Sequence, residues 1–246
     1  MKGLLLDNYA AVSEYAATLV EEQVRGNAQS VLGLATGATP LGLYENICNS
    51  FEERGVSYKD VRTINLDEYL GLERTHPESY YTFMNEKLFK HIDLAIENAY
   101  IPDGKPSSVG EECVRYDKIL DCIGPINLQI LGIGTNGHIG FNEPGTNSNS
   151  TTHIVELTPS TRKSNAHFFQ SFEEIPTHAI TMGIKSILKS EKIILLASGE
   201  SKAEAVKTLL SKQVTERFPA SFLWNHDNVT LIVDRDAYQL VELERQ

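Results

Sequence analysis

Short apolar runs alternate along the chain with segments whose apolar residues recur every three or four positions. Six of the runs are short enough to be single strands: 31–36, 61–66, 126–133, 178–182, 192–198 and 229–234. Three of them, 31–36, 126–133 and 192–198, are apolar almost throughout, which is typical of strands buried on both faces of a sheet.

Helical periodicity fills the intervals between these runs. It is clearest over 8–24, where five apolar residues fall on one helical stripe. Further helices are predicted over 79–91, 108–123 and 200–211, and directly after Pro40, which we expect at the first helical position. Strands that alternate with helices predict an α/β fold: a Rossmann-like three-layer sandwich whose mainly parallel sheet carries helices on both faces.

Composition narrows the classes of protein that fit this pattern. No long polar linker and no internal repeat interrupts residues 1–246, so we expect a single domain. The chain has 22 Lys and Arg against 33 Asp and Glu, a formal net charge of -11. Such a surface repels phosphate backbones and anionic lipids, so we expect neither a nucleic acid nor a membrane as partner. A small anionic ligand remains compatible if a few donors gather locally.

The same composition predicts a cytoplasmic protein. No apolar run approaches the roughly 18 residues that span a bilayer, and the apolar run near the N-terminus is too short for a secretory signal. The three cysteines, Cys48, Cys113 and Cys122, are an odd number without C-x-x-C spacing. We therefore expect reduced thiols rather than disulfides or a zinc site.

Two strand-to-helix junctions are candidates for binding an anion, because ligands of open parallel sheets bind at the carboxyl ends of the strands. After the first long run, Thr36, Gly37, Ala38 and Thr39 precede a predicted helix, whose N-terminus offers unpaired N–H groups. Thr39 could cap that helix or donate to a phosphate group, and a plain turn explains the stretch equally well. The second candidate is Lys202, which is expected in the first turn of the last predicted helix, where the helix dipole disfavours a cation unless an anion binds there.

A pair of carboxylates follows another predicted strand. Side chains alternate in direction along a strand, so only one of Asp67 and Glu68 can face a shared pocket. A carboxylate at a strand end is a candidate general base. Taken alone, an Asp that caps the next turn is the simpler interpretation.

Residues 131–145, LGIGTNGHIGFNEPG, contain the G-x-G-x-x-G spacing of dinucleotide-binding loops. The glycines and proline that follow make the required helix improbable, so we do not predict a dinucleotide site. The loop instead carries Asn136, His138 and Glu143. A carboxylate beside a histidine raises its basicity and fixes its tautomer, the usual arrangement of a proton-shuttling histidine. With no metal-ligand spacing of the H-E-x-x-H type, these groups predict a metal-free acid–base site for a small phosphorylated molecule.

Seven stretches, in the same order, resemble glucosamine-6-phosphate deaminases of the glucosamine/galactosamine-6-phosphate isomerase family: LGLATGATP, NLDEYLGL, HPESYYTFMNE, LGIGTNGHIGFNEPG, TRKSNAHFF, AITMGIKSIL and SGESKAEAV. The resemblance spans about residues 30–235. It implies a hydrolase of amino sugar catabolism that needs no cofactor and converts glucosamine 6-phosphate and water to fructose 6-phosphate and ammonia.

The resemblance also implies residue roles. Asp67 removes the C2 proton and returns it at C1, and His138 opens the sugar ring, with Glu143 and Asn136 tuning and orienting it. The phosphate group is held by Thr36, Gly37, Ala38, Thr39, Lys202 and position 167.

Two positions depart from the family pattern. Asn136 replaces an Asp of some members and cannot add negative charge beside His138. His167 stands where an Arg phosphate ligand is expected, which predicts weaker or more pH-dependent binding. Whether Arg162, five residues earlier, compensates is left open by the sequence.

Three alternatives stay open at this point. A galactosamine-6-phosphate deaminase/isomerase differs only in the epimer it accepts. A 6-phosphogluconolactonase needs no base at C2, so its activity would not depend on Asp67. A sugar-phosphate-sensing domain needs a DNA-binding module, and the acidic chain has no basic helix-turn-helix segment. The sequence is compatible with a homo-oligomer without predicting one.

Overall fold

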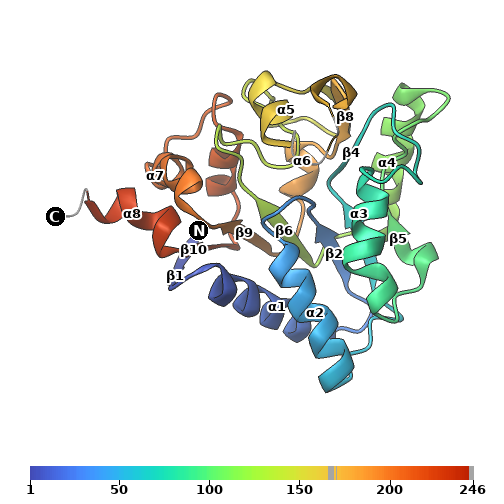
Figure 1. The fold of residues 1–246 in the computed structure, drawn as a ribbon, viewed down its shortest axis with the longest axis horizontal. Coiled ribbons are helices and arrows are strands. Elements are labelled where there is room, and N and C mark those ends of the chain that lie inside the picture. The colour runs from blue at the N-terminus through green and yellow to red at the C-terminus, as the bar shows by residue number, and fades with distance from the viewer. Residues whose placement is uncertain (166–168, 170, 244–246) are drawn as a thin grey trace.

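A parallel sheet of seven strands forms the middle layer of the protein (Figure 1). The computed structural model describes residues 1–165, 169 and 171–243. In spatial order the strands are β1 (Lys2–Leu6), β10 (Val229–Asp234), β9 (Ile193–Ala197), β6 (Leu128–Gly132), β2 (Val31–Leu34), β3 (Arg62–Asn65) and β5 (Ala99–Tyr100). From β2 the chain builds β3 and β5 on one side, and it then returns to place β6 on the other side. The crevice between the carboxyl ends of β2 and β6 is therefore a topological switch point, where such sheets bind ligands.

Helices cover both faces of this sheet because its strands are apolar on both sides. Along β9, Ile193 and Leu195 pack into one core, whereas Ile194 and Leu196 pack into the other. One core is closed by α1 (Tyr9–Gly26), α2 (Leu41–Arg54) and α3 (Tyr80–Lys87). The opposite core is closed by α4 (Val109–Ile123), α6 (Ile184–Ile187), α7 (Ala203–Leu210) and α8 (Arg235–Leu243). The predicted three-layer α/β architecture is confirmed.

A second, antiparallel sheet stands on the carboxyl edge of the first. Its order is β4 (Asp67–Tyr69), β8 (His178–Thr181) and β7 (His153–Glu156). Leu66 joins the two sheets, since its N–H donates to the Leu34 carbonyl at 3.1 Å and its own carbonyl accepts from the Met182 N–H at 2.7 Å. The strand predicted at 178–182 thus exists, but it pairs antiparallel in this small sheet. The helix α5 (Pro159–Asn165) follows β7.

Other differences from the sequence-based expectation are local. Pro40 is the N-cap of α2 rather than its first helical residue, and Thr39 is not the cap. Lys202 is the last residue of a 3-10 turn (Glu200–Lys202) and the N-cap of α7. Among the described elements, the strands β1, β4, β5 and β7 and the helices α5, α6 and α8 were not predicted. Over the part of the chain that the structure describes, no helix combines the length and apolar character needed to cross a membrane.

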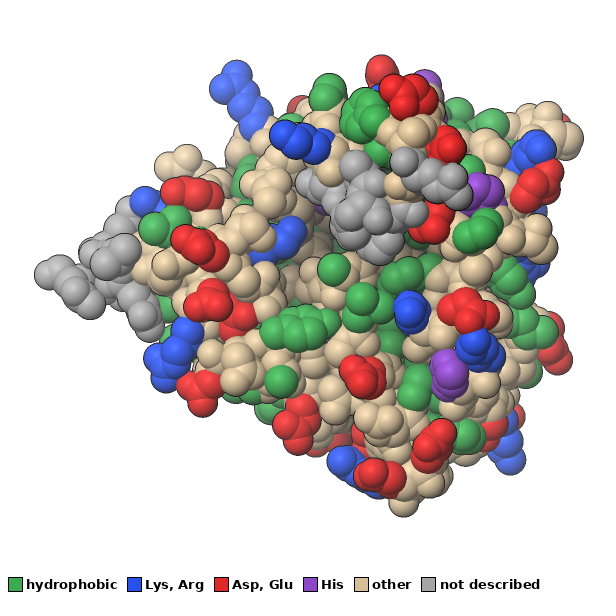
Figure 2. All heavy atoms as spheres, viewed as in Figure 1, with side chains coloured by type: hydrophobic (Ala, Val, Ile, Leu, Met, Phe, Trp, Pro, Cys, Tyr) green, Lys and Arg blue, Asp and Glu red, His purple; other side chains and the backbone are tan. Residues whose placement is uncertain are grey.

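The face of the molecule shown in Figure 2 carries acidic and basic side chains interspersed with one another. No large patch of basic side chains is visible there. The same mixture is expected from the whole chain, in which 33 acidic residues stand against 22 Lys and Arg.

Candidate active site

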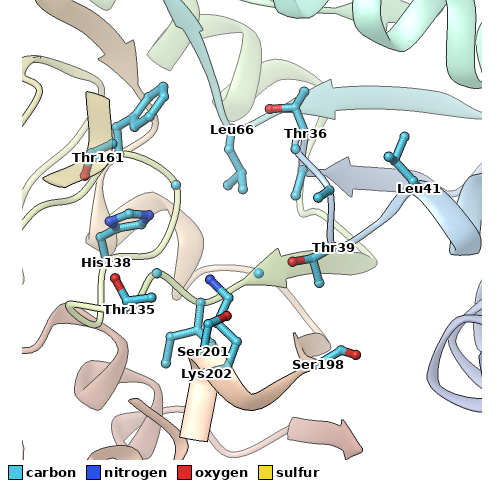
Figure 3. Close-up of a pocket in the computed structure, with 18 of the residues that line it drawn as sticks. Thr36, Thr39, Leu41, Leu66, Thr135, His138, Thr161, Ser198, Ser201 and Lys202 are labelled. Carbon is cyan, nitrogen blue, oxygen red and sulfur yellow. The ribbon is translucent and has the colours of Figure 1, made fainter. Parts of the chain in front are cut away.

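A cavity of about 830 Å³ opens where the carboxyl ends of the central strands meet. Its walls come from the loops after β2, β6 and β9 and from the start of β4. It brings together eight of the predicted site residues: Thr36, Gly37, Ala38, Thr39, Asp67, Asn136, His138 and Lys202. Figure 3 shows Thr39 and His138 on opposite sides, with Lys202 between them. Asp67 and His138 therefore face the same cavity.

Asp67 begins β4 and lines the cavity, whereas Glu68 does not. Alternation along a strand sends the two adjacent carboxylates in opposite directions, as the sequence required. Glu68 turns instead toward the start of α3, where it accepts hydrogen bonds from the backbone N–H groups of Tyr80 (2.9 Å) and Tyr81 (3.0 Å). Glu68 thus anchors the start of a helix, and Asp67 faces the cavity.

Asp67 is only 5% exposed, and this burial dominates its acidity. The pKa of Asp67 is raised from 3.8 to about 8, chiefly by burial and also by the charge of Glu68, while the Phe141 backbone N–H opposes the shift. The loop comes this close because Gly140 has a φ of +56° and no side chain; a Cβ there would lie 3.3 Å from Asp67 Oδ2. A carboxylate with a raised pKa is a stronger base than an ordinary aspartate.

The histidine lies beside a buried carboxylate. His138 Nδ1 is 3.6 Å from Glu143 Oε2, close enough for electrostatic attraction but longer than a hydrogen bond. The same oxygen accepts a hydrogen bond from Asn136 Nδ2 at 2.7 Å, and Asn136 Oδ1 accepts from the His138 backbone N–H at 3.2 Å. Burial raises the pKa of Glu143, but attraction to His138 and hydrogen bonds from Thr161 and Asn136 outweigh burial and leave the pKa lowered. Glu143 is therefore a fixed negative charge next to the imidazole.

The part of the cavity formed by the loop 36–39 and Lys202 is suited to an anion. Burial lowers the pKa of Lys202, and none of the described carboxylates contributes to that shift. Three of the first four N–H groups of α2 already have partners: Leu41 donates to Ala38, Gly42 to Tyr9 and Tyr44 to Pro40. Donors for an anion would therefore come mainly from the loop 36–39 and from Lys202 rather than from the helix end.

Two further positions need separate mention: His167, a predicted phosphate ligand, and Arg162, whose part in phosphate binding the sequence left open. His167 lies outside the described residues. The guanidinium of Arg162 donates to the backbone carbonyls of Phe172 (3.1 Å) and Ile175 (3.0 Å), so its Nη2 is held by the segment that follows α5. Arg162 is not one of the described residues that line the cavity. In the described part of the chain, no group of three or more His, Cys, Asp or Glu could hold a metal ion.

Comparison with known proteins places this site in a family. Residues 7–232 match the family model described as glucosamine-6-phosphate isomerases/6-phosphogluconolactonase. The chain belongs to this family. Among its relatives is a glucosamine-6-phosphate deaminase of Geobacillus sp. (strain WCH70), 50% identical over 246 residues, which are 100% of this chain and 98% of that protein. Another deaminase, from Halalkalibacterium halodurans, is 49% identical over 241 residues, 98% of each chain.

Solved structures of the family agree with the fold. A monomeric glucosamine-6-phosphate deaminase superimposes with a TM-score of 0.97 at 44% identity, covering 98% of this chain and 100% of that one. A 6-phosphogluconolactonase from Trypanosoma brucei has a TM-score of 0.78 at 16% identity, covering 98% of each chain, and shows the shared fold alone. The hydrolase class expected from the resemblance is not supported, because the relatives that match over the whole chain are named deaminases.

In this family member the glycines of 131–145 serve the histidine loop. A Cβ at Gly134 would lie 2.4 Å from His138 Cε1, so the imidazole packs directly on the backbone of Gly134. Gly137 has a φ of +85°, and a Cβ there would lie 2.2 Å from the ring of Phe218. Between Gly137 and the start of β7 at His153, a range that the structure describes in full, no helix begins, and Ile139 and Asn142 form an isolated bridge. The rejection of a dinucleotide site from sequence agrees with this geometry.

Thr158 and Thr161 were missed by the sequence analysis, although they hold Glu143. Thr161 is 4% exposed, lines the cavity and donates a short hydrogen bond to Glu143 Oε1, and Thr158 Oγ1 donates to the same oxygen at 3.3 Å. Their spacing at the start of α5 is that of a helix cap, and Thr158 does accept from the Thr161 N–H at 3.3 Å. Because helix capping already explains both threonines, the sequence gives no sign of their contact with Glu143, which lies 15 and 18 positions earlier.

Tyr80 is a second residue that the sequence analysis missed. It lines the cavity next to Asp67, and its ring stacks on Phe141 with centroids 5.9 Å apart. Burial raises the pKa of Tyr80, and the neighbouring groups Tyr69 and Asp67 add to the shift. Its hydroxyl is therefore a neutral donor in the cavity wall. Tyr80 lies in HPESYYTFMNE, one of the stretches that resemble the family, but the sequence analysis did not single out this tyrosine.

Thr161→Val is expected to lower kcat about tenfold, because a hydrogen bond to a charged group contributes about 1.5–3 kcal/mol and part of it would be replaced by Thr158. Valine keeps the shape of threonine, so the change removes the donor and little else. Steady-state turnover measures the effect, and Thr161→Ser, which keeps the hydroxyl, is the matched control. Equal kcat in the Val variant and the wild type would show that this contact does not position Glu143.

Asp67→Asn is expected to stabilise the protein as the pH rises. The pKa of Asp67 is raised in the folded state to about 8, so its contribution to stability is complete below about pH 4 and is lost between about pH 4 and pH 8. Asparagine does not ionise and escapes this loss. The melting temperature of the variant should exceed that of the wild type by at least about 2–4 °C near pH 8, and by less near pH 4. With exposed Asp60→Asn as control, a difference that stays constant or shrinks with rising pH would contradict the burial argument.

Proposed function

We propose that the protein is a glucosamine-6-phosphate deaminase, which isomerises and deaminates glucosamine 6-phosphate to fructose 6-phosphate and ammonia. The observation that carries this proposal is the placement of a base, a histidine–carboxylate pair and a cationic anion site around one cavity. Relatives about 50% identical over the whole chain bear the name of this enzyme.

The reaction needs only proton transfers and water. Opening of the pyranose ring turns C1 into an aldehyde, which makes the hydrogen on C2 acidic. A base removes that hydrogen as a proton, and the electron pair forms an enol-type intermediate. Return of a proton to C1 leaves a C2 imine, and water hydrolyses the C=N bond to a ketone and ammonia. General acid–base groups are sufficient for every step.

The proposed roles follow from the positions of the described residues and, for His167, from the resemblance to the family. Asp67, with its raised pKa, is the base between C2 and C1. His138, held beside Glu143, moves the proton that opens the ring, and Asn136 orients the loop around it. Thr36, Gly37, Ala38, Thr39 and Lys202 bind the phosphate group, with His167 as a further proposed ligand.

The cellular location of the enzyme, its need for cofactors and its oligomeric state are also proposals. We propose a cytoplasmic enzyme of amino sugar catabolism that acts as one domain over residues 1–246 without metal or cofactor. A structurally similar deaminase, 44% identical, is described as monomeric. We therefore propose that a single chain is catalytically complete.

Ammonia release from the purified protein tests the function. Glucosamine 6-phosphate, galactosamine 6-phosphate and 6-phosphogluconolactone are offered separately, each with a chelator present. The proposal predicts ammonia and fructose 6-phosphate from the first, at a rate that the chelator leaves unchanged. Preference for the galactosamine epimer would reassign the substrate, and lactone hydrolysis without ammonia release would overturn the proposal.

A further inference from the structure

Tyr9, the first residue of α1, reaches the junction between the loop 36–39 and α2. Its hydroxyl donates to the Ala38 carbonyl at 3.1 Å and accepts from the Gly42 N–H at 2.7 Å. These two groups lie on either side of Pro40, so one hydroxyl bridges the end of the loop and the start of the helix. Tyr9, Ala38 and Gly42 all line the cavity.

Close packing of α1 against α2 keeps this bridge in place. A Cβ at Gly42 would lie 2.5 Å from Ser13 Oγ and 3.1 Å from Tyr9 Cε1, so only glycine allows the approach. The start of α1 is itself fixed, because Asn8 Oδ1 accepts from the Ala11 N–H at 3.0 Å. The tyrosine therefore stands on a rigid helix rather than on a flexible terminus.

The loop that Tyr9 holds needs an external support. Gly37 has a φ of +86°, which glycine adopts readily because it lacks a side chain, so residue 37 adds no side-chain contact that would fix the loop. Within the loop junction, the Leu41 N–H reaches the Ala38 carbonyl only at 3.4 Å. The hydroxyl of Tyr9 shares that carbonyl at a shorter distance and is the stronger constraint on the position of residue 38.

We propose that Tyr9 is a positioning residue for phosphate binding. It holds the loop 36–39 in the conformation that presents its backbone N–H groups and threonine hydroxyls to the anion, without touching the reacting carbon atoms. The inference rests on the proposed function for the identity of the substrate, but the bound group it concerns is the phosphate alone.

Tyr9→Phe tests the proposal, because phenylalanine keeps the ring and removes only the bridging hydroxyl. Two hydrogen bonds are lost, so the KM for glucosamine 6-phosphate and the Kd for inorganic phosphate, measured by calorimetry, are both expected to rise about fivefold to tenfold. The kcat should stay within about twofold, because binding of the phosphate is equal in ground and transition states. Tyr15→Phe, an exposed tyrosine on the same helix, is the matched control and should change neither constant.

Inorganic phosphate separates this inference from the proposed function. If the wild type binds phosphate and Tyr9→Phe binds it more weakly, the positioning role stands even when glucosamine 6-phosphate is not turned over. An unchanged Kd for phosphate in Tyr9→Phe overturns the role, whatever happens to kcat. An equal loss of affinity in Tyr15→Phe overturns it as well, because the effect would then not depend on the bridge.

Discussion

Replacing Asp67 by Asn is expected to lower kcat/KM for glucosamine 6-phosphate by about 10²–10⁴-fold, the usual contribution of a general base. Asparagine keeps the shape of the side chain but cannot accept the C2 proton. Because burial raises the pKa of Asp67 to about 8, the fraction of wild-type enzyme with an ionised base grows with pH. The kcat/KM of the wild type should therefore rise up to about pH 8, and the variant should lack this dependence. Ammonia release across that pH range measures both effects.

Glu68→Gln provides the comparison, since Glu68 is the adjacent carboxylate outside the cavity. Removing its charge removes one cause of the raised pKa of Asp67, so the pH profile should move to lower pH while activity persists. An Asp67→Asn enzyme that keeps more than about a tenth of the wild-type kcat/KM would contradict the role of Asp67 as base. Such a result would favour a reaction without C2 proton abstraction, such as lactone hydrolysis.

Replacing His138 by Gln is expected to reduce kcat/KM by about 10²-fold or more, because glutamine cannot carry a proton between the ring oxygen and the C1 hydroxyl. His138 packs on Gly134, and its Nδ1 lies 3.6 Å from Glu143 Oε2. The loss of activity should therefore arise from lost proton transfer rather than from a collapsed site. Turnover of glucosamine 6-phosphate measures the loss, and an unchanged melting temperature would show that the fold is intact.

An isotope effect separates the two roles. Deuterium at C2 of the substrate slows only the step in which the C2–H bond breaks. In His138→Gln, ring opening should limit the rate and suppress this isotope effect. In Asp67→Asn the effect should persist or grow. An isotope effect as large in His138→Gln as in Asp67→Asn would show that His138 does not act at ring opening.

The central sheet and the polar clusters could be predicted from the sequence for one physical reason. Strands buried on both faces are apolar along their length, and parallel strands bring their carboxyl ends, and the loops that follow, to one edge. That reasoning placed Asp67, Asn136, His138 and Lys202 near one another without any knowledge of contacts. The roles of these residues stay predictions until they are tested.

The parts that were missed have weak local signals. In β7, His153–Glu156, half-buried and exposed residues alternate, and β5 has two residues, so neither is an apolar run. By contrast, α8 could have been predicted, because the apolar residues Ala237 and Val241 lie four positions apart in the sequence, and both are buried. The supports of the site could not, since Tyr9 and Thr161 act through contacts with Ala38 and Glu143, which lie 29 and 18 residues away in sequence.

A crystal structure with a bound open-chain amino-alditol 6-phosphate, which mimics the opened sugar, tests the central claim most directly. The account predicts that C2 of this molecule lies next to the Asp67 carboxylate and its C5 hydroxyl next to His138. Its phosphate group should contact the loop 36–39 and the Lys202 ammonium. A complex with the phosphate group beside His138, or with C2 out of reach of Asp67, would contradict it.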